Sequence, residues 1–396
     1  MQTKQSGLSI RIVSYNILSD SLCTADHFNH SNPDDLNNDI RFKRITMKLQ
    51  EEINKKSIIC LQEVSRSWKI KLVKFLKNNQ YAHFDSLYGS RFNGYMGVFM
   101  AWPNDKLILE KSKNERIAES VKWGDPKTFP YENPIPNTTQ SSVSSWWSIS
   151  SFIHSVKFYI SSFFYPSEQT TNLLSSSSSS LLPSSFPRPS GRVVFKWDSW
   201  EEAARRENCA VMVRLTDRVT KKRFVVSTYH MPCLFGSDEK CQVMVAHIAL
   251  LMQSAQRFAG KDPLIVAGDF NMQPDSIPYE LAIKGTLSED HPQHPPMPAP
   301  IVAPRSLPWN VKFHPMRSAY VVANGEEPNF TNFAWSAFDS RNAFKGTLDY
   351  IFISDEWKVS TVKSLKDIID NVNENGFPSL TEPSDHVLIA SDLSLS

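Results

Sequence analysis

The sequence of 396 residues lacks an excess of either charge. Lysine and arginine number 43 against 41 aspartate and glutamate residues, so the formal net charge is only +2. A long nucleic-acid footprint usually brings a basic face, and the composition gives no sign of one over the whole surface. Any recognition of phosphate by this chain must therefore be local.

The sequence also lacks a C-x-x-C pair and an amino-terminal apolar segment. Its five cysteines are odd in number, which fits a reducing compartment better than a disulfide framework. Zinc binding by His230, Cys233 and Cys241 is an alternative, but we favour buried free thiols. An alternating strand begins near Leu8, which leaves no room for a signal peptide. We expect a cytoplasmic protein, with the nucleus as the alternative location.

Apolar strands and amphipathic helices alternate along most of the chain. The patterns predict strands at 8–16 and 57–61 with a helix between them, a hairpin within 209–233 and a long helix at 241–259. Helices and strands that interleave in this way, with hairpins among them, favour an α+β fold built as a sandwich.

Two stretches depart from this plan. Residues 122–192 are rich in serine, proline and aromatic residues, which predicts one long insertion. Within it, residues 146–164 place apolar side chains three and four apart, as in a helix that packs on the protein's own surface or docks on a membrane surface or a partner protein. Residues 286–312 are rich in proline and contain two histidines, which predicts an extended surface loop.

Polar residues stand at or next to the ends of the predicted apolar strands. Strand ends at one edge of a sheet meet in a common crevice, so we expect these residues to form a single site. Carboxylates suit Mg²⁺ or Mn²⁺, amide and imidazole groups suit phosphate oxygens, and a histidine beside an acid can be held ready for proton transfer. The residues are Asn16, Glu63, His230, Asp269, Asn271, Asp349, Asp385 and His386.

Each of these residues, taken alone, has an ordinary structural explanation. Asn16 could form a turn, Glu63 could cap a helix, and a lone His230 is more often a hydrogen-bonded core residue. Asp269 and Asn271 could only shape the turn that follows them. These explanations do not account for the fact that the polar termini carry groups suited to a metal or a phosphate.

Six segments show a resemblance that covers residues 8–111 and 208–395. SYNILSD, CLQEV, STYHMPC, AGDFNMQPDS, GTLDYIF and SDHVLIA resemble, in order, motifs of the endonuclease/exonuclease/phosphatase superfamily, the deoxyribonuclease I-like fold. The resemblance implies a two-layer α/β-sandwich, with two packed mixed β-sheets flanked by helices, as a single catalytic domain over 1–396. It also implies a phosphoric ester hydrolase that uses Mg²⁺ or Mn²⁺.

The same resemblance implies metal-side roles for three residues. Glu63 of the QEV segment would be the principal metal ligand. Asn16 would support the metal and the phosphate. Asp385 of the SDH segment would be a further acid on the metal side.

It implies catalytic roles for the other five. His230 would bind the scissile phosphate, and Asp269 would orient or deprotonate the attacking water. Asn271 would steady the transition state. Asp349 would orient the catalytic histidine, His386.

The segment before the final LDYIF resembles a narrower branch, that of the carbon catabolite repressor deadenylases, nocturnin and the Angel proteins. There an aromatic residue two positions before a glycine stacks on a base, and Phe344 stands at that place. The Ala-Trp-Cys-Asp-Arg type of motif of inositol-polyphosphate phosphatases is absent. YHMPCLF replaces the His-x-His-Trp-Asp-Pro run of the poly(A) deadenylases, so Phe235 falls near the place of the proline that sandwiches adenine. Poly(A) specificity is therefore not implied.

These features support three functions in descending order. The first is a magnesium-dependent 3′-exoribonuclease, a monomer with RNA or a nucleotide as substrate. The second keeps the chemistry but acts on a small phosphorylated molecule, such as a dinucleotide 2′-phosphate or a sphingolipid or inositide head group. The third, a catalytically inactive binding module, is the weakest because the set of motifs is complete.

Overall fold

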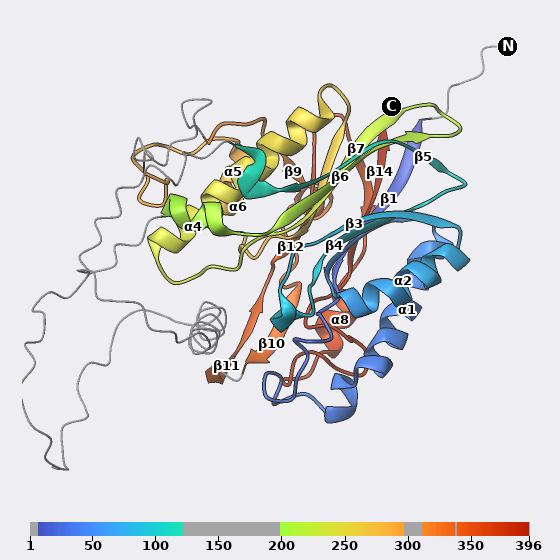
Figure 1. The fold of residues 1–396 in the computed structure, drawn as a ribbon, viewed down its shortest axis with the longest axis vertical. Coiled ribbons are helices and arrows are strands. Elements are labelled where there is room, and N and C mark those ends of the chain that lie inside the picture. Colours follow the sequence, from blue (N-terminus) through green and yellow to red (C-terminus); the bar gives the residue numbers. More distant parts are fainter. Residues whose placement is uncertain (1–6, 122–198, 297–310, 337–338, 396) are drawn as a thin grey trace, which may run out of the picture.

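Two six-stranded β-sheets lie face to face at the centre of the protein (Figure 1). The structure, a computed structural model, describes residues 7–121, 199–296, 311–336 and 339–395. The first sheet has the strand order β13-β14-β1-β2-β4-β3. Its strands are β1 (Leu8–Asn16), β2 (Ile58–Val64), β3 (Tyr81–Leu87), β4 (Gly97–Pro103), β13 (Lys358–Val362) and β14 (Ile389–Leu395).

The second sheet has the order β5-β6-β7-β8-β12-β9, and β10 and β11 form a separate two-stranded sheet. Both large sheets are mixed, because β1 pairs with β2 and β7 pairs with β8 in parallel, while their other pairs are antiparallel. The strands are β5 (Leu107–Arg116), β6 (Cys209–Asp217), β7 (Arg223–His230), β8 (Leu264–Asp269), β9 (Arg317–Ser318), β10 (Asn332–Ser336), β11 (Asp339–Gly346) and β12 (Asp349–Ile353).

Helices cover the outer faces of the two sheets. α1 and α2 pack on the first sheet, and α4, α5 and α6 pack on the second. Polar caps begin the longer ones: Asn37 accepts two backbone N–H groups at the start of α1, and Ser65 accepts one at the start of α2. The helices are α1 (Asn38–Asn54), α2 (Arg66–Asn78), α4 (Ser199–Arg205), α5 (Asp238–Ala259), α6 (Ile277–Lys284), α7 (Ala319–Asn324) and α8 (Lys366–Asn371), with short 3-10 turns at Pro33–Leu36, Arg91–Asn93 and Ile117–Ser120.

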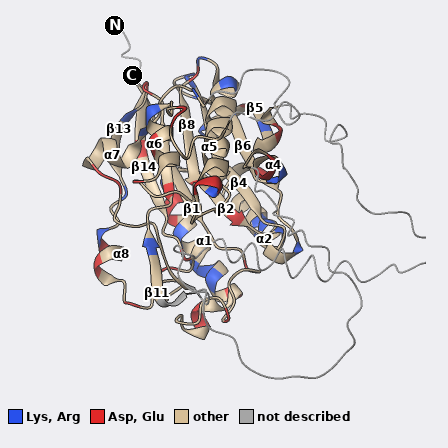
Figure 2. Cartoon of the chain, turned by 90° about the vertical axis from the view of Figure 1, so that its left-hand side faces the viewer, with Lys and Arg blue, Asp and Glu red and all other residues tan. Residues whose placement is uncertain are grey.

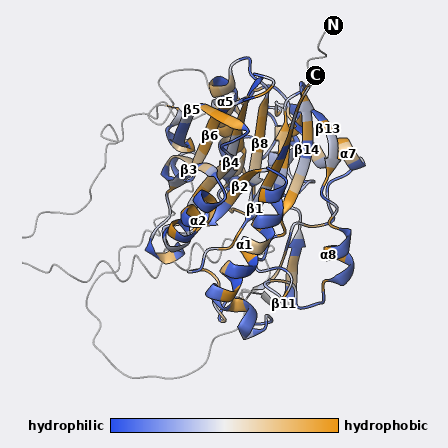
Figure 3. Cartoon of the chain, turned by 90° about the vertical axis from the view of Figure 1, so that its right-hand side faces the viewer, coloured by the Kyte–Doolittle hydropathy of each residue, from blue (hydrophilic) through white to orange (hydrophobic). Residues whose placement is uncertain are grey.

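The central strands are apolar on both faces because each face has its own core. In β8, Leu264 and Val266 join the cluster under α5, whereas Ile265 and Ala267 join the cluster between the sheets. Burial on both faces explains a continuous apolar run in place of an alternating one. In Figure 3 several central strands carry the hydrophobic colour, and α8 on the outside is mostly hydrophilic. The predicted α+β sandwich of two mixed sheets with flanking helices is confirmed.

The insertion predicted at 122–192, with its helical segment at 146–164, lies outside the described residues. The loop predicted at 286–312 is described only in part, and residues 286–296 contain no helix or strand. This part lies along α4 and α5, since Trp200 Nε1 donates to the Pro296 carbonyl at 2.6 Å and Gln242 Nε2 donates to the Pro292 carbonyl at 2.9 Å.

The distribution of charged residues and the burial of the cysteines can be compared with what the sequence predicts. Figure 2 shows basic and acidic residues distributed among one another over the face it views. All five cysteines are free, but only Cys23 and Cys60 are buried. The expectation of buried thiols is therefore wrong for Cys209, Cys233 and Cys241, which are half-buried. No helix in the described parts of the chain has the length and apolarity needed to cross a bilayer.

Candidate active site

Strand register brings three of the polar strand-end residues into one row. β7 runs parallel to β8 and places His230 opposite Asp269. β12 runs antiparallel to β8, so its first residue, Asp349, is also opposite Asp269. Gly268 precedes this row at a close approach, because a Cβ atom there would lie 2.0 Å from the Tyr229 carbonyl oxygen. The glycine is therefore required for β8 to present its terminal aspartate beside β7.

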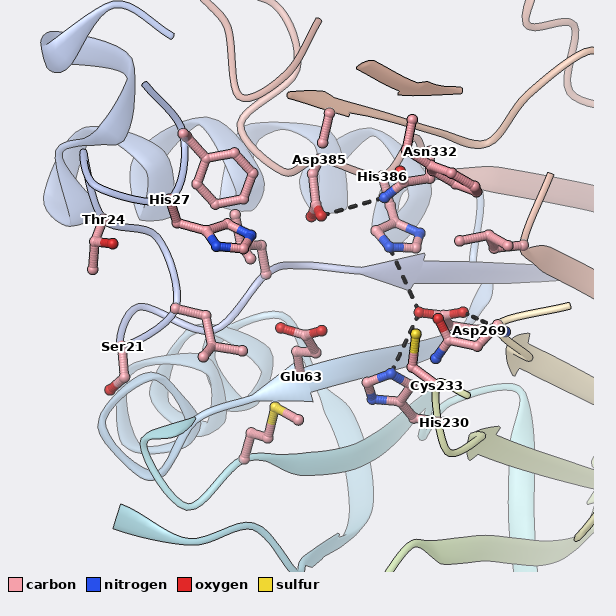
Figure 4. A pocket seen from close by; sticks show the side chains of 18 of the residues that line it. Ser21, Thr24, His27, Glu63, His230, Cys233, Asp269, Asn332, Asp385 and His386 are labelled. Carbon is pink, nitrogen blue, oxygen red and sulfur yellow. Dashed lines mark hydrogen bonds and ion pairs between the residues drawn. The ribbon is translucent and has the colours of Figure 1, made fainter. Parts of the chain in front are cut away.

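The Asp269 carboxylate lies at the centre of the site (Figure 4). Its Oδ2 accepts a hydrogen bond from Asn16 Nδ2 at 2.9 Å and lies 3.5 Å from His230 Nε2 and 3.6 Å from His386 Nε2. Its Oδ1 accepts the backbone N–H of Asn271 at 2.9 Å. One buried carboxylate oxygen thus faces two imidazole rings and an amide from both sheets.

Asp349 and His386 form a tight buried pair. His386 Nδ1 lies 2.7 Å from Asp349 Oδ2, and Thr331 Oγ1 donates to the same oxygen at 2.7 Å. Burial alone would lower the pKa of His386, but the carboxylates of Asp349, Asp269 and Asp385 outweigh it and raise that pKa well above the usual value. Burial raises the pKa of Asp349 to about 6, although His386 opposes the shift. The pair therefore favours an imidazolium facing a carboxylate.

Glu63 has no cationic side chain as a hydrogen-bond or ion-pair partner among the described residues. Its Oε1 accepts Asn16 Nδ2 at 3.1 Å and its Oε2 accepts the Ser19 backbone N–H at 3.0 Å. Burial raises the pKa of Glu63, His230 opposes this rise, and Asp385 adds to it. The Glu63 backbone is left-handed, with φ of 56°, as is that of Asn271 with φ of 48°. Such strain persists in a folded protein only where surrounding contacts hold it.

A cavity of about 250 Å³ joins these groups. Its polar lining residues include Glu63, His230, Asp269, Asn271, Asp385 and His386. Further aromatic side chains that line it are His27, Phe28, Phe92, Phe235 and Phe344. No lysine or arginine is among the described residues that line it. An anionic phosphate would therefore meet carboxylates here, with the His386 imidazolium but no lysine or arginine to offset them.

The donor set fits a divalent cation beside Glu63. Glu63 and Asp385 supply hard oxygen ligands whose charge no lysine or arginine offsets within the cavity. Asp269, Asp349 and His386 also lie within 4.8 Å of one another. His386 Nδ1 and Asp349 are already bonded to each other, however, so we assign these two to an oriented histidine. The zinc set of His230, Cys233 and Cys241 is not found as a metal-binding group among the described residues.

All ten predicted site residues lie at this edge of the sandwich, but two of them lie behind the cavity wall. Asn16 does not line the cavity. Its side chain lies behind Glu63 and Asp269, to which its Nδ2 donates, and its Oδ1 accepts the Leu18 backbone N–H at 3.0 Å. Asp349 likewise lies behind His386. The other eight residues line the cavity itself.

Sequence patterns missed several residues that hold the site. Thr331 donates to Asp349 Oδ2 and accepts the backbone N–H of Leu348 at 2.9 Å, and its TNF context has no distinguishing signal. His27 lines the cavity from the loop after β1, and Asn332 Nδ2 donates to Asp385 Oδ2 at 3.3 Å. The sequence could have pointed to Arg41, because this charged residue stands on the otherwise mostly apolar stripe of α1 that is buried.

A sandwich of two mixed sheets with acids and histidines gathered at one edge is the deoxyribonuclease I-like fold. The sequence profile of the Endonuclease/Exonuclease/phosphatase family matches residues 13–386. The chain therefore belongs to this family.

Curated proteins resemble the chain in sequence at low identity. The chain is 24% identical over 427 residues to the "CCR4-Not complex 3'-5'-exoribonuclease subunit Ccr4" of Aspergillus oryzae, covering 96% of this chain and 46% of that protein. It spans about half the length of the Ccr4 relatives it matches.

Solved structures share the fold at low identity. "ANGEL2, a 2',3'-cyclic phosphatase, in complex with adenosine-2',3'-vanadate" superposes with a TM-score of 0.62 at 17% identity, over 98% of this chain and 96% of that one. The human Nocturnin catalytic domain with bound sulfate gives a TM-score of 0.52 at 16% identity, over 99% and 97% of the two chains.

Proposed function

We propose that this protein is a divalent-metal-dependent phosphoric ester hydrolase that cleaves RNA from its 3′ end. The observation that carries the proposal is the position of Asp269 Oδ2, within 3.6 Å of both histidines and inside a cavity that Glu63 and Asp385 also line. Hydrolysis of a phosphodiester needs a base for water and positive charge near the phosphate oxygens. The names of the Ccr4 relatives support RNA as the substrate.

In this proposal Asp269 accepts the proton of the attacking water. A new bond forms between the water oxygen and phosphorus, and the bond from phosphorus to the leaving ribose oxygen breaks, with solvent supplying the proton to that oxygen. His386, held as an imidazolium by Asp349, and His230 stabilise the charge on the non-bridging oxygens. Asn271 contributes a further donor to the phosphate.

Glu63 and Asp385 would hold Mg²⁺ or Mn²⁺, and the ion when bound would neutralise phosphate charge in a cavity without lysine or arginine. The contacts of Asn16 favour a positioning role, because both of its amide hydrogens are directed at carboxylates. Phe344 and Phe235, which both line the cavity, are placed to contact a base.

A second candidate function is hydrolysis of a small phosphorylated molecule. The observation that favours it is the absence of lysine and arginine from the described cavity lining, together with a net charge of only +2. A long RNA usually meets a basic track. Five free thiols suit action in the cytoplasm for either substrate.

A substrate panel separates these candidates. The panel contains poly(A), mixed-sequence RNA, RNA with a blocked 3′ end, 2′,5′-linked oligomers, RNA with 2′,3′-cyclic ends and small phosphate esters. Each is tested with Mg²⁺, with Mn²⁺ and with chelator. We expect stepwise shortening of 5′-labelled RNA that stops with a blocked 3′ end or with chelator. If no RNA in the panel is cleaved in a metal-dependent way, the first function is overturned. If only the small phosphate esters are cleaved, the second function is established.

A further inference from the structure

Arg41 is a fully buried guanidinium in the first turn of α1. Its Nε donates to the Pro383 carbonyl oxygen at 2.6 Å. Its Nη2 donates to the carbonyl oxygens of Ile17 at 2.9 Å and Leu18 at 2.7 Å. Its Nη1 donates to Asn38 Oδ1 at 3.0 Å. The guanidinium therefore joins two chain segments that are more than 360 residues apart in sequence.

These two segments carry the metal side of the candidate active site. Ile17 and Leu18 directly follow Asn16, which donates to Glu63, and Pro383 stands two residues before Asp385. Leu18 is itself held in the left-handed region with φ of 52°. A loop with a left-handed residue needs tertiary contacts to keep its shape, and a planar fork of donors suits that task.

The charge of Arg41 has no carboxylate partner at hydrogen-bond distance within the described residues, since each of its four acceptors is a neutral oxygen. A buried cation without an ion pair destabilises a folded protein. The side chain is nevertheless enclosed, with its guanidinium carbon 4.9 Å from the centre of the Trp68 ring. An apolar residue at this place would leave the carbonyl oxygens of Ile17, Leu18 and Pro383 without these donors.

We propose that Arg41 is a positioning residue that holds segment 16–19 against segment 383–386, and thereby sets Glu63 and Asp385 at the spacing a divalent cation needs. This inference rests on the proposed function. It concerns contacts behind the ligands, which generally change metal affinity by about tenfold to a hundredfold when they are lost.

The test compares Arg41→Lys with Arg11→Lys in the full chain. Lysine keeps the charge but cannot present the same fork of donors to both segments. Arg11 is a matched control, because it lies on β1 near the end far from the site and bonds Glu52 and Asp392 at 2.7 Å. Two quantities are measured. The first is the affinity for Mn²⁺ without substrate, determined from the electron paramagnetic resonance signal of free Mn²⁺. The second is the thermal unfolding temperature in the presence of chelator.

We expect Arg41→Lys to weaken Mn²⁺ binding by about tenfold or more, and Arg11→Lys to leave it unchanged at a comparable loss of thermal stability. Wild-type Mn²⁺ affinity in Arg41→Lys would overturn the inference, whatever its unfolding temperature.

If Arg41→Lys does not fold, Asn38→Ala takes its place. This variant removes one acceptor of the guanidinium and leaves the charge, so we expect a smaller loss of affinity, about twofold to fivefold. Unchanged affinity in Asn38→Ala would then overturn the inference. A wild-type protein that bound no Mn²⁺ would instead contradict the proposed function, so the two failures are distinguishable.

Discussion

Two regions of this sandwich each bury a histidine, and they leave it in opposite states. At the edge that carries the site, His386 is 4% exposed and contacts Asp349, which contributes to a pKa well above the usual value. In the core under α5, His247 is fully buried and contacts Tyr229 Oη at 2.8 Å and the Ala203 carbonyl. Burial there lowers the pKa of His247 to about 3.

The difference shows that burial by itself does not set the charge of a residue. The site region gathers carboxylates around its histidines, whereas the core region gives His247 a hydroxyl and a carbonyl as contacts, and the charges of Arg206 and Arg116 lower its pKa further. Buried charges without full compensation reduce the free energy of unfolding, so the site region is expected to trade stability for activity. Substitutions at the site should therefore lower activity without lowering stability, and substitutions in the core should do the reverse.

The largest effect is expected from Glu63→Gln, which removes a buried charge and keeps the shape of the side chain. Activity should fall about a thousandfold or more, because a metal ligand contributes several kcal/mol to the reaction. The unfolding temperature should stay the same or rise. Glu327→Gln is the control, since burial also raises the pKa of Glu327, which bonds Tyr279 outside the cavity. Equal turnover in both variants would refute the assignment of Glu63.

His386→Ala and Asp269→Asn should each lower kcat by about a hundredfold to ten-thousandfold, with a much smaller change in KM. Both groups are proposed to act in the transition state, where proton transfer and charge build-up occur. Steady-state kinetics at saturating metal checks this. Normal kcat with a raised KM in either variant would show that the proton-transfer group lies elsewhere.

Phe344→Ala should weaken the binding of the transition state of an RNA substrate by about 1–3 kcal/mol if the ring stacks on a base. A phosphodiester of ribose that lacks the base is the control substrate and should be cleaved as before. The comparison uses kcat/KM for both substrates at one metal concentration. An equal loss on both substrates would make Phe344 a packing residue of the cavity wall.

Acid should destabilise the core region through His247. Its pKa is lowered to about 3 in the folded protein, so between its usual value and pH 3 only the unfolded chain takes up the proton. Stability is therefore lost as pH falls, by about 2 kcal/mol between pH 7 and pH 5. Urea unfolding at both pH values should show this loss in the wild type. In His247→Gln the loss of unfolding free energy between pH 7 and pH 5 should be smaller by that amount. An equal loss in the variant and the wild type would remove His247 as the cause.

The smallest effect is expected from deletion of residues 138–188, which are not among the residues that the structure describes. The residues found to line the cavity all belong to other parts of the chain. Activity on a short RNA should stay within about twofold of the wild type, as for a tolerated change in a connecting segment. A misfolded or inactive deletion variant would mean that this segment belongs to the core or to the wall of the site.

Much of the site could be predicted because its signals are local in sequence. Glu63 and Asp269 each stand at or near the end of an apolar strand, and His230 ends the second strand of a hairpin that the pattern predicts. A strand buried on both faces excludes polar residues, so a polar residue at its terminus marks a place where the core ends. Neighbouring terminal residues then share one edge of the sheet.

Other features had no local signal. The row of His230, Asp269 and Asp349 depends on one parallel and one antiparallel register, and a shift of one residue would turn the aspartates to the other face. Arg41 could be predicted as helical but not as a link between the two ends of the chain. The short strand β9 and the short helices α7 and α8 carry too few residues for a periodic pattern.

The sequence by itself determined the alternation of strands and helices, the family motifs and the chemical types of groups at the strand ends, because these depend on neighbouring residues. Only the tertiary structure decided that Asn16 bridges Glu63 and Asp269, that Thr331 donates to Asp349, and that the cavity holds no lysine or arginine among its described residues. The physical reason is that two sheets bury their shared faces as a whole. The register that buries the most apolar surface fixes which distant side chains meet, and no single segment contains that information.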